Sequence, residues 1–149
     1  MDPSKLNLEA LTVEELSTLK QRMEEDLRVF LQTTSNFMGL KKKYEASKVL
    51  VENLVKKKDG VPEEVLIPLS NSLYIPGQIL NKDKYIVDIG TGYYAERNGE
   101  QAIKYCIETM EVIDSNLNSV SQEIKKKRDF LDTVNIALQN KVLKSRGLA

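Results

Sequence analysis

Few side chains in this sequence of 149 residues have the type and spacing that catalysis requires. There is no His, which is the commonest general base and metal ligand, and the single cysteine, Cys106, can form neither an internal disulfide nor a thiolate zinc site. Carboxylates are paired at Glu14 and Glu15 and at Glu24 and Glu25, but adjacent residues of a helix do not face one another. We therefore expect that the chain is not an enzyme and that it holds no catalytic residue, metal or cofactor.

Neither of two sequence patterns associated with nucleotide binding is complete in this chain. The segment Gly90-Thr91-Gly92 resembles part of a dinucleotide loop, but Ala95 stands where the third glycine would fall, and no helix is expected to begin there. The GxxxxGK[ST] pattern of phosphate-binding loops does not occur. The glycine pair is more typical of a hairpin turn. Cys106 falls in an apolar position of a helix, which favours an inert core thiol.

Charge is balanced, since 22 Lys and Arg residues are matched by 22 Asp and Glu residues. Basic runs occur at 41–43 and 125–128, but acidic residues surround them, so solvated helix faces are favoured over a nucleic-acid site. No apolar run approaches the roughly 18 residues of a membrane helix, and residues 1–12 lack the pattern of a signal peptide. We expect no nucleic-acid or membrane partner and a cytoplasmic location, with a nuclear role left open.

Two long segments carry the heptad repeat of a coiled coil, in which apolar residues recur every seven positions. In the first segment the a positions are Leu16, Met23, Phe30, Phe37, Tyr44 and Val51, and the d positions are Leu19, Asp26, Thr33, Leu40, Ser47 and Leu54. In the second segment the a positions are Ile103, Met110, Leu117, Ile124, Leu131 and Leu138, and the d positions are Cys106, Ile113, Val120, Lys127, Val134 and Lys141. The pattern predicts helices over 13–58 and 99–146.

The ends of both helices are marked in the sequence. Thr12 with Glu15, and Asn98 with Gln101, have the spacing of capping boxes. The lysines at 56–58 are expected to lie in the last turn of the first helix and to complement its carbonyl end.

The length of the insert between the helices predicts the topology. Residues 59–98 are too few to lead the chain back along such a helix and also to build a sheet, so an antiparallel pairing of the two helices is expected. Both termini then lie at one end and the insert at the other. This register places Asp26 within about one helical turn of Lys127, and we predict that they form an ion pair.

The insert predicts two β-hairpins, near 64–80 and 84–97, from short β-branched and aromatic runs separated by turn residues. Pro68 and Pro76 suggest positions that are locally unpaired. Four short strands cannot cover their own apolar face, so we infer that strands of other subunits complete the sheet. The residues expected to build this assembly surface are Val65, Ile67, Leu69, Leu73, Ile75, Ile79, Val87, Ile89 and Tyr93.

The expected fold class is α+β, mostly α: a long antiparallel coiled-coil hairpin with two β-hairpins inserted between the helices at one end, in one domain over 1–149. Further apolar side chains lie outside the heptad seam near the termini. A patch that binds other apolar chains and a pair of frayed helix ends are both compatible with them. The candidate residues of this patch are Leu6, Leu8, Leu11, Val13, Ile136, Val142, Leu143 and Leu148.

The chain resembles the α-type subunits of prefoldin over nearly its whole length. The most specific segments are VLIPLSNSLYIPG at 65–77 and IVDIGTGYYAE at 86–96, and two hairpins rather than one favour the α type. The resemblance implies a heterohexamer with one further α-type and four β-type subunits, whose strands form a double β-barrel. It also implies that coiled-coil tips capture unfolded clients such as actin and tubulin without ATP and pass them to the cytosolic group II chaperonin. The alternative is a coiled-coil scaffold or transcriptional adapter that binds one folded partner.

Overall fold

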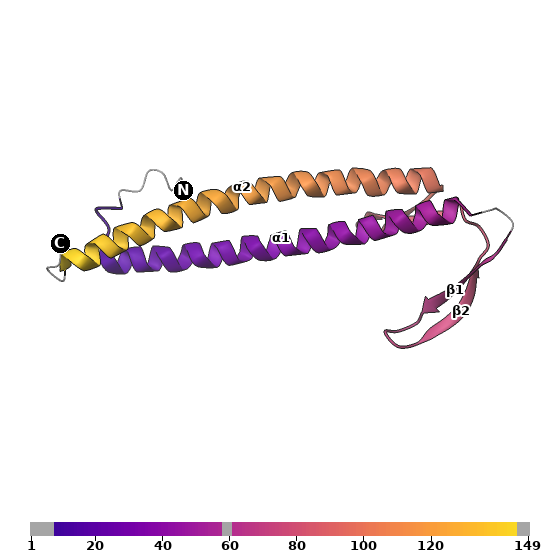
Figure 1. Ribbon diagram of the computed structural model, residues 1–149, viewed down its shortest axis with the longest axis horizontal. Coiled ribbons are helices and arrows are strands. Elements are labelled where there is room, and N and C mark those ends of the chain that lie inside the picture. Colours follow the sequence, from indigo (N-terminus) through magenta and orange to yellow (C-terminus); the bar gives the residue numbers. More distant parts are fainter. Residues whose placement is uncertain (1–7, 58–60, 146–149) are drawn as a thin grey trace. The chain divides into compact units, whose positions relative to one another are not determined.

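The computed structural model describes residues 8–57 and 61–145, and it contains two long helices with four strands between them. The elements in chain order are α1 (Val13–Val55), β1 (Glu63–Pro68), β2 (Tyr74–Ile79), β3 (Tyr85–Gly90), β4 (Tyr93–Arg97) and α2 (Gly99–Ser145). The predicted mostly helical α+β fold with two inserted hairpins is confirmed (Figure 1).

Both predicted capping boxes are present. The Thr12 N–H donates to Glu15 Oε2 at 2.8 Å, and the Glu15 N–H donates to Thr12 Oγ1 at 3.2 Å. Asn98 and Gln101 make the same reciprocal pair of bonds at 3.2 and 2.9 Å. Each box satisfies amides that have no partner in the first turn of a helix, which explains why α1 begins at Val13 and α2 at Gly99.

The end of α1 differs from the prediction. The helix ends at Val55 rather than at residue 58, and its last turn contains no basic residue. Lys57 instead forms an ion pair with Glu63 at the start of β1. Lys57 therefore links the end of α1 to the start of β1 and does not lie in the last turn of the helix. The prediction that the lysines at 56–58 complement the carbonyl end of the helix was wrong. The predicted residue 58, like residue 146 at the other helix end, lies outside the described residues.

The structure divides into two compact units, which are named here by their content. The helical unit comprises 8–39 and 114–145, and the hairpin unit comprises 40–57 and 61–113. Within each unit a segment of α1 and a segment of α2 run antiparallel, side by side (Figure 1).

In the helical unit the predicted antiparallel register is confirmed. Leu16 and Val134 are fully buried, and Leu27 is 8% exposed. Lys127 Nζ lies 2.8 Å from Asp26 Oδ2, as the register predicted, and it also lies 5.3 Å from the centre of the Phe30 ring. The positive charge of Lys127 thus lies inside the seam, where the Asp26 carboxylate and the Phe30 ring both stabilise it.

In the hairpin unit the apolar seam shifts away from the heptad pattern. The d positions Leu40 and Ser47 are exposed, whereas Lys41 and Lys48, one position later, are half-buried. Elsewhere in this unit the seam contains five buried apolar residues, which are Val51 and Leu54 of α1 and Ala102, Cys106 and Ile113 of α2. The heptad pattern therefore predicts the covered a positions throughout both helices, and the covered d positions only in part.

The four strands form two separate antiparallel hairpins. β1 pairs with β2 from Glu63 opposite Ile79 to Pro68 opposite Tyr74. β3 pairs with β4 from Tyr85 opposite Arg97 to the closing pair at Gly90, with a bulge in β3 just before the turn.

The turn between β3 and β4 is the predicted glycine turn. Gly90, Thr91 and Gly92 all have positive φ, of 100°, 52° and 82°. A two-residue hairpin turn whose twist matches that of the strands requires positive φ at both of its residues, which are Thr91 and Gly92 here. Glycine recurs in this turn because it adopts positive φ without strain.

The second hairpin is held to α2 by polar contacts. Asp83 Oδ1 accepts a 2.6 Å hydrogen bond from the Gly99 N–H, and the Tyr105 hydroxyl donates to the Asp88 carbonyl at 3.0 Å. Gly99 is tightly surrounded, because a Cβ there would collide with the Val55 side chain and lie 3.1 Å from the Asp83 carboxylate. The absence of a side chain at this position lets the segment before β3, the start of α2 and the end of α1 converge.

Candidate assembly and client-binding surfaces

Potential metal ligands do not cluster in the part of the chain that the structure describes. Among residues 8–57 and 61–145, no three His, Cys, Asp or Glu side chains are close enough to hold a metal ion. Cys106 is 7% exposed, and burial raises the pKa of its thiol, which favours the protonated and less nucleophilic form. Neither described helix contains an apolar stretch long enough to span a bilayer.

One face of the first hairpin carries an apolar row that becomes more exposed toward its turn. Val65 is half-buried, Ile67 is 44% exposed and Leu69 is 58% exposed. Across the hairpin, Ile75 and Leu73 are 42% and 57% exposed, while Ile79 is half-buried. The predicted assembly residues of β1 and β2 therefore share a face, because odd-numbered residues of both strands lie opposite one another.

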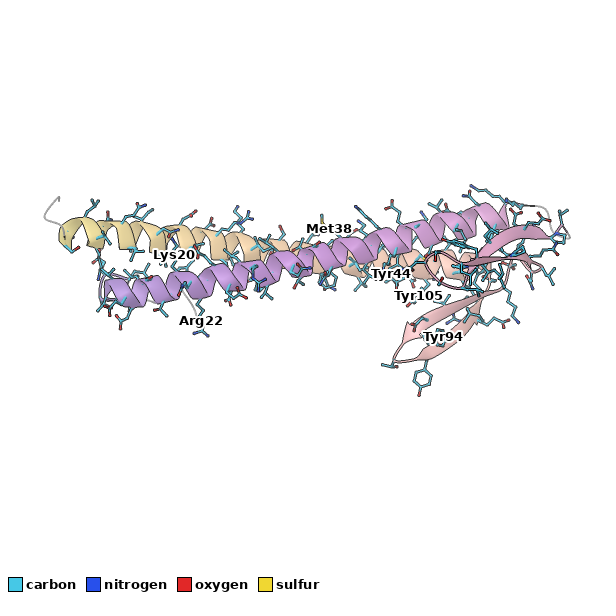
Figure 2. The ribbon with its side chains drawn as sticks, turned by 90° about the horizontal axis from the view of Figure 1, so that it is seen from below. Lys20, Arg22, Met38, Tyr44, Tyr94 and Tyr105 are labelled. Atoms are coloured by element: carbon cyan, nitrogen blue, oxygen red, sulfur yellow. The ribbon has the colours of Figure 1, made fainter. Side chains whose placement is uncertain are left out.

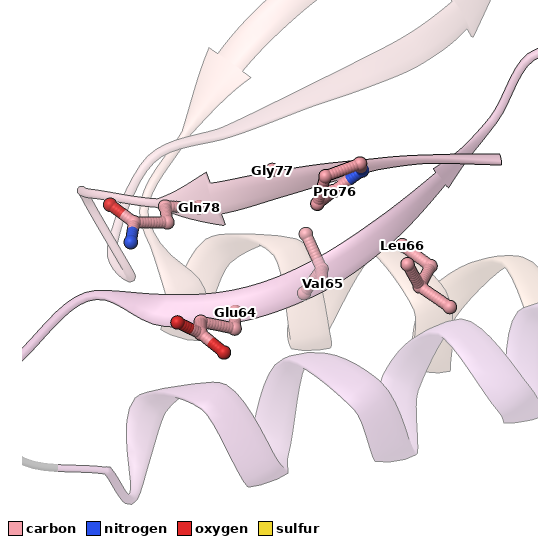
Figure 3. A pocket seen from close by; sticks show the side chains of 6 residues that line it. All are labelled: Glu64, Val65, Leu66, Pro76, Gly77 and Gln78. Carbon is pink, nitrogen blue, oxygen red and sulfur yellow. The ribbon is translucent and has the colours of Figure 1, made fainter.

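Gly77 makes room for this apolar row. A Cβ at Gly77 would lie 2.5 Å from Ile67 Cδ1, so the Ile67 side chain leans across β2 over the glycine. The middle of the hairpin also forms an open groove of about 470 Å³ (Figure 3). Its lining residues are Glu64, Val65, Leu66, Pro76, Gly77 and Gln78. Because both faces of the hairpin contribute to it, the groove is part of an exposed strand surface rather than an enclosed ligand pocket.

The second hairpin is partly covered at the end away from its turn and open near the turn. Tyr85, Val87 and Ala95 are half-buried, whereas Ile89 and Tyr93 near the turn are 50% and 70% exposed. Burial raises the pKa of Tyr85, whose hydroxyl donates to the Lys82 carbonyl at 2.6 Å. Of the predicted assembly residues in this hairpin, Val87 is thus partly used inside the chain, and the two near the turn are accessible.

The opposite faces of both hairpins are also apolar, which the sequence reasoning missed. Leu66 is 69% exposed and Tyr74 51% on the first hairpin, and Ile86 is 63% and Tyr94 67% exposed on the second. Figure 2 shows Tyr94 pointing away from its hairpin. The signal was present, because a strand that is apolar at successive positions is typical of one buried on both faces. Among the described residues these opposite faces are left open, and exposed apolar surface of this kind is typical of an interaction surface.

In the helical unit, part of the predicted client-binding set lies on one helix face. Ile136 and Leu143, seven residues apart on α2, are 59% and 45% exposed, and the neighbouring Val142 is half-buried. Leu31 and Met38 form a second exposed pair on α1, and Figure 2 shows Met38 projecting outward.

The segment before α1 lies against the same part of α2. Lys141 Nζ donates to the Glu9 carbonyl at 2.8 Å and also to the Leu11 carbonyl. This contact brings Leu8 and Leu11, both half-buried, toward the last turns of α2. Val13, at the start of α1, is 39% exposed. Leu6 and Leu148, the remaining predicted members, lie outside the described residues.

Comparison with known proteins assigns the chain to a family. The family model "Prefoldin subunit" matches residues 23–144. Probable prefoldin subunit 5 of Dictyostelium discoideum is 31% identical over 92% of this chain and 84% of its own length. Probable prefoldin subunit 5 of Schizosaccharomyces pombe is 32% identical over 91% and 88%, and prefoldin subunit 5 of Homo sapiens is 23% identical over 92% and 88%.

A solved structure shares the fold. The cryo-EM structure of filamentous PFD from Methanocaldococcus jannaschii matches with a TM-score of 0.69 and 15% identity, covering 80% of this chain and 98% of the other. The resemblance in segments 65–77 and 86–96 is to subunit 5 in particular, in agreement with the relatives named above. Two long helices, two inserted hairpins and these relatives together show that the chain belongs to the prefoldin family, as a subunit of the α type.

Proposed function

We propose that this chain works as one subunit of a cytoplasmic heterohexamer that captures unfolded proteins of the actin and tubulin kind and passes them to the group II chaperonin without using ATP. One further α-type and four β-type subunits complete the assembly. The observation that carries the proposal is that both hairpins expose apolar side chains on both faces, among them Leu66, Ile67 and Tyr94. Short strands with open edges and exposed apolar faces favour pairing with other strands, which would cover both.

Assembly through the hairpins has a clear driving force. Each large apolar side chain that moves from about half exposed to buried contributes on the order of 1 kcal/mol. The nine predicted assembly residues include six that are at least 42% exposed. Their combined burial, together with strand pairing, favours association and opposes the entropy that association costs.

Client capture is assigned to the helical unit, because its exposed apolar side chains lie on a helix whose backbone is already hydrogen-bonded. Ile136 and Leu143 can therefore offer only contacts that have no fixed direction, which suits clients that share no sequence. Several such weak surfaces on one assembly would bind a client tightly by effective concentration, while each contact stays reversible.

Serine substitution on α2 tests this function. The triple variant Ile136→Ser, Val142→Ser and Leu143→Ser should assemble normally with the other prefoldin subunits but suppress the aggregation of denatured actin severalfold less well, as measured by light scattering. A matched control replaces three exposed polar residues of the same helix, Asp132→Ser, Gln139→Ser and Asn140→Ser, and should behave as the unmodified protein.

Two outcomes would contradict the proposal at different points. Unchanged suppression by the triple variant would show that these residues do not contact the client. Failure of the unmodified assembly to act on any denatured protein, with capture of one folded partner instead, would favour the scaffold or adapter function.

A further inference from the structure

The junction between β4 and α2 contains the one Asn-Gly sequence of the chain, Asn98 followed by Gly99. In such a pair the backbone nitrogen of the glycine can attack the side-chain carbonyl carbon of the asparagine, because no side chain hinders its approach. The new C–N bond closes a succinimide ring, and the side-chain nitrogen leaves as ammonia with the proton that the glycine N–H gives up. Water then opens the ring at either of its carbonyl carbons, which leaves aspartate or isoaspartate at the asparagine position.

Packing makes glycine necessary after Asn98. Gly99 is buried, and a Cβ at this position would collide with the Val55 side chain. A larger residue, which would shield the attacking nitrogen, therefore has no room here. Asn98 itself is exposed, so water can reach the ring once it has formed. The junction thus combines a sequence prone to deamidation with access for the second reactant.

The folded chain engages the groups that would react. The Gly99 N–H donates to Asp83 Oδ1 at 2.6 Å, and this bond must be lost before the nitrogen can give up its proton. Asn98 Oδ1 accepts a hydrogen bond from the Gln101 N–H, and the Asn98 carbonyl accepts one from the Ala102 N–H, both at 2.9 Å. Ring closure turns the Asn98 side chain from the Gln101 amide toward the Gly99 nitrogen, so it also releases the cap.

Asp83 opposes the reaction by its position and by its charge. Its carboxylate holds the Gly99 N–H, and a nearby negative charge disfavours the amide anion that attacks the asparagine. The Asp83 N–H donates to Asn81 Oδ1 at 3.0 Å, which fixes the turn that presents the carboxylate. Because Asp83 belongs to the loop before β3, the protection depends on the contact between the second hairpin and α2.

We propose that Asn98 is a site of spontaneous deamidation that the Asp83 contact keeps closed, and that the modification accumulates in chains whose second hairpin has separated from α2. Aspartate at this position is still a good helix cap. Isoaspartate adds one backbone carbon before Gly99, which already fits tightly against Val55, so the junction cannot close as before. The reaction thus converts a transient opening into a lasting one. The inference does not rest on the proposed function, since it concerns contacts within this chain alone.

Four variants of the full-length chain test the assignment. Asp83→Ala removes the acceptor, and Asp83→Asn keeps an oxygen acceptor without the charge. Tyr105→Phe removes a second hydrogen bond between the hairpin and α2, the one to the Asp88 carbonyl, and so loosens the hairpin at a distance from Asn98. Glu96→Gln is the matched control, because it removes a carboxylate of the same hairpin whose ion pair with Lys84 does not involve α2.

Each protein is incubated at mildly alkaline pH, both folded and in concentrated urea, and is then cleaved after lysine. Mass spectrometry of peptide 85–104 measures the replacement of the Asn98 amide by a carboxyl group, and chromatography separates its aspartate and isoaspartate forms. Circular dichroism checks that the helices persist in the folded samples. If Asp83→Ala fails to fold, Asp83→Asn still reports the contribution of the contact.

In the unmodified chain, Asn98 should deamidate at least roughly tenfold more slowly when folded than in urea, because the reaction requires local opening. Asp83→Ala should raise the folded-state rate roughly tenfold, and Asp83→Asn and Tyr105→Phe about threefold. Glu96→Gln should stay within about twofold. Equal rates in the folded chain and in urea would overturn the proposal, as would unchanged rates in both Asp83 variants or an equal acceleration by Glu96→Gln. An unchanged rate in Tyr105→Phe would overturn the link to separation of the hairpin.

The two products provide a second readout. Amide hydrogen exchange in β3 and β4 should be faster in chains that carry isoaspartate at position 98 than in chains that carry aspartate, because only isoaspartate lengthens the backbone. The variant Asn98→Asp supplies the aspartate form as a reference. Equal exchange in the two forms would show that the modification does not keep the junction open.

Discussion

The hairpin unit and the helical unit both expose large apolar side chains, but their backbones differ in the bonds that they can still make. Along a helix, every N–H beyond the first turn is already paired, so Ile136 and Leu143 offer side-chain contacts alone. Along an edge strand, alternate backbone groups point outward, so Leu66 offers its side chain together with directional hydrogen bonds. A surface of the second kind can select one partner in one register, whereas a surface of the first kind accepts many partners.

The difference is consistent with the two tasks proposed for the chain. Assembly requires a fixed partner and a fixed geometry, and strand edges supply both. Client binding requires tolerance, because unfolded chains share little beyond apolar side chains. The polar contacts that join the second hairpin to α2, at Asp83 and Asp88, are also directional, which holds the strand surface in a defined orientation within its unit.

Charged side chains on the hairpins should have the largest effect. Ile67→Asp combined with Val87→Asp should abolish hexamer formation, because assembly would bury carboxylates with no partner. Native mass spectrometry measures the assembled fraction, and circular dichroism should show that the helices persist. The matched variant Ile136→Asp, in the helical unit, should leave assembly intact. A normal hexamer from the double variant would remove these residues from the assembly surface.

Loss of a helix cap should have an intermediate effect and should separate the two units. Thr12→Ala and Asn98→Ala each remove one capping box and should lower the free energy of unfolding by about 1 kcal/mol in urea titrations. Only Asn98 lies beside Gly99, which anchors the second hairpin, so Asn98→Ala alone should also reduce assembly. Equal assembly of both variants would argue against a role for this junction in presenting the hairpins.

The seam ion pair should have the smallest effect and a distinct pH dependence. The hydrogen bond and charge of Lys127 hold the pKa of Asp26 below its ordinary range in the folded chain. The stabilisation is therefore fully present above the unfolded pKa and is lost as the pH falls through the lower, folded value. The melting temperature of Asp26→Asn should lie slightly below that of the unmodified chain at pH 7, and the two should converge as the pH falls below about 4.

A surface ion pair serves as the control for this pH dependence. Glu123 lies 2.7 Å from Lys126 on the same helix, and both side chains are largely exposed. Glu123→Gln should leave the melting temperature unchanged at every pH, because such exposed pairs contribute little. A pH-independent difference for Asp26→Asn would mean that the carboxylate acts through packing rather than through its charge.

The features that the sequence predicted correctly have local or periodic causes. A capping box depends on four consecutive residues, so Thr12 and Asn98 could be identified without the rest of the fold. The Asp26–Lys127 pair followed from two heptad patterns and one antiparallel register. The glycine turn between β3 and β4 followed from residues that tolerate positive φ.

The errors arose where tertiary contacts compete with local preference. The lysines after Val55 were expected to complement the helix dipole, but Glu63 of the following strand is close enough to pair with Lys57. Leu40 and Ser47 are exposed because the buried stripe drifts from the d to the e positions, an effect that a fixed seven-residue period cannot represent. The second apolar face of each hairpin does not follow from an alternating pattern, because such a pattern predicts apolar residues on one face only.

The shielded position of Cys106 makes this chain convenient for site-specific labelling. Maleimide dyes and spin labels react with thiolates, and a buried thiol with a raised pKa supplies very few of them at neutral pH. A cysteine introduced at an exposed position, such as Ile136→Cys, would therefore react first without any need to remove the native one. Fluorescence from that single position could report when a denatured protein arrives and when it leaves.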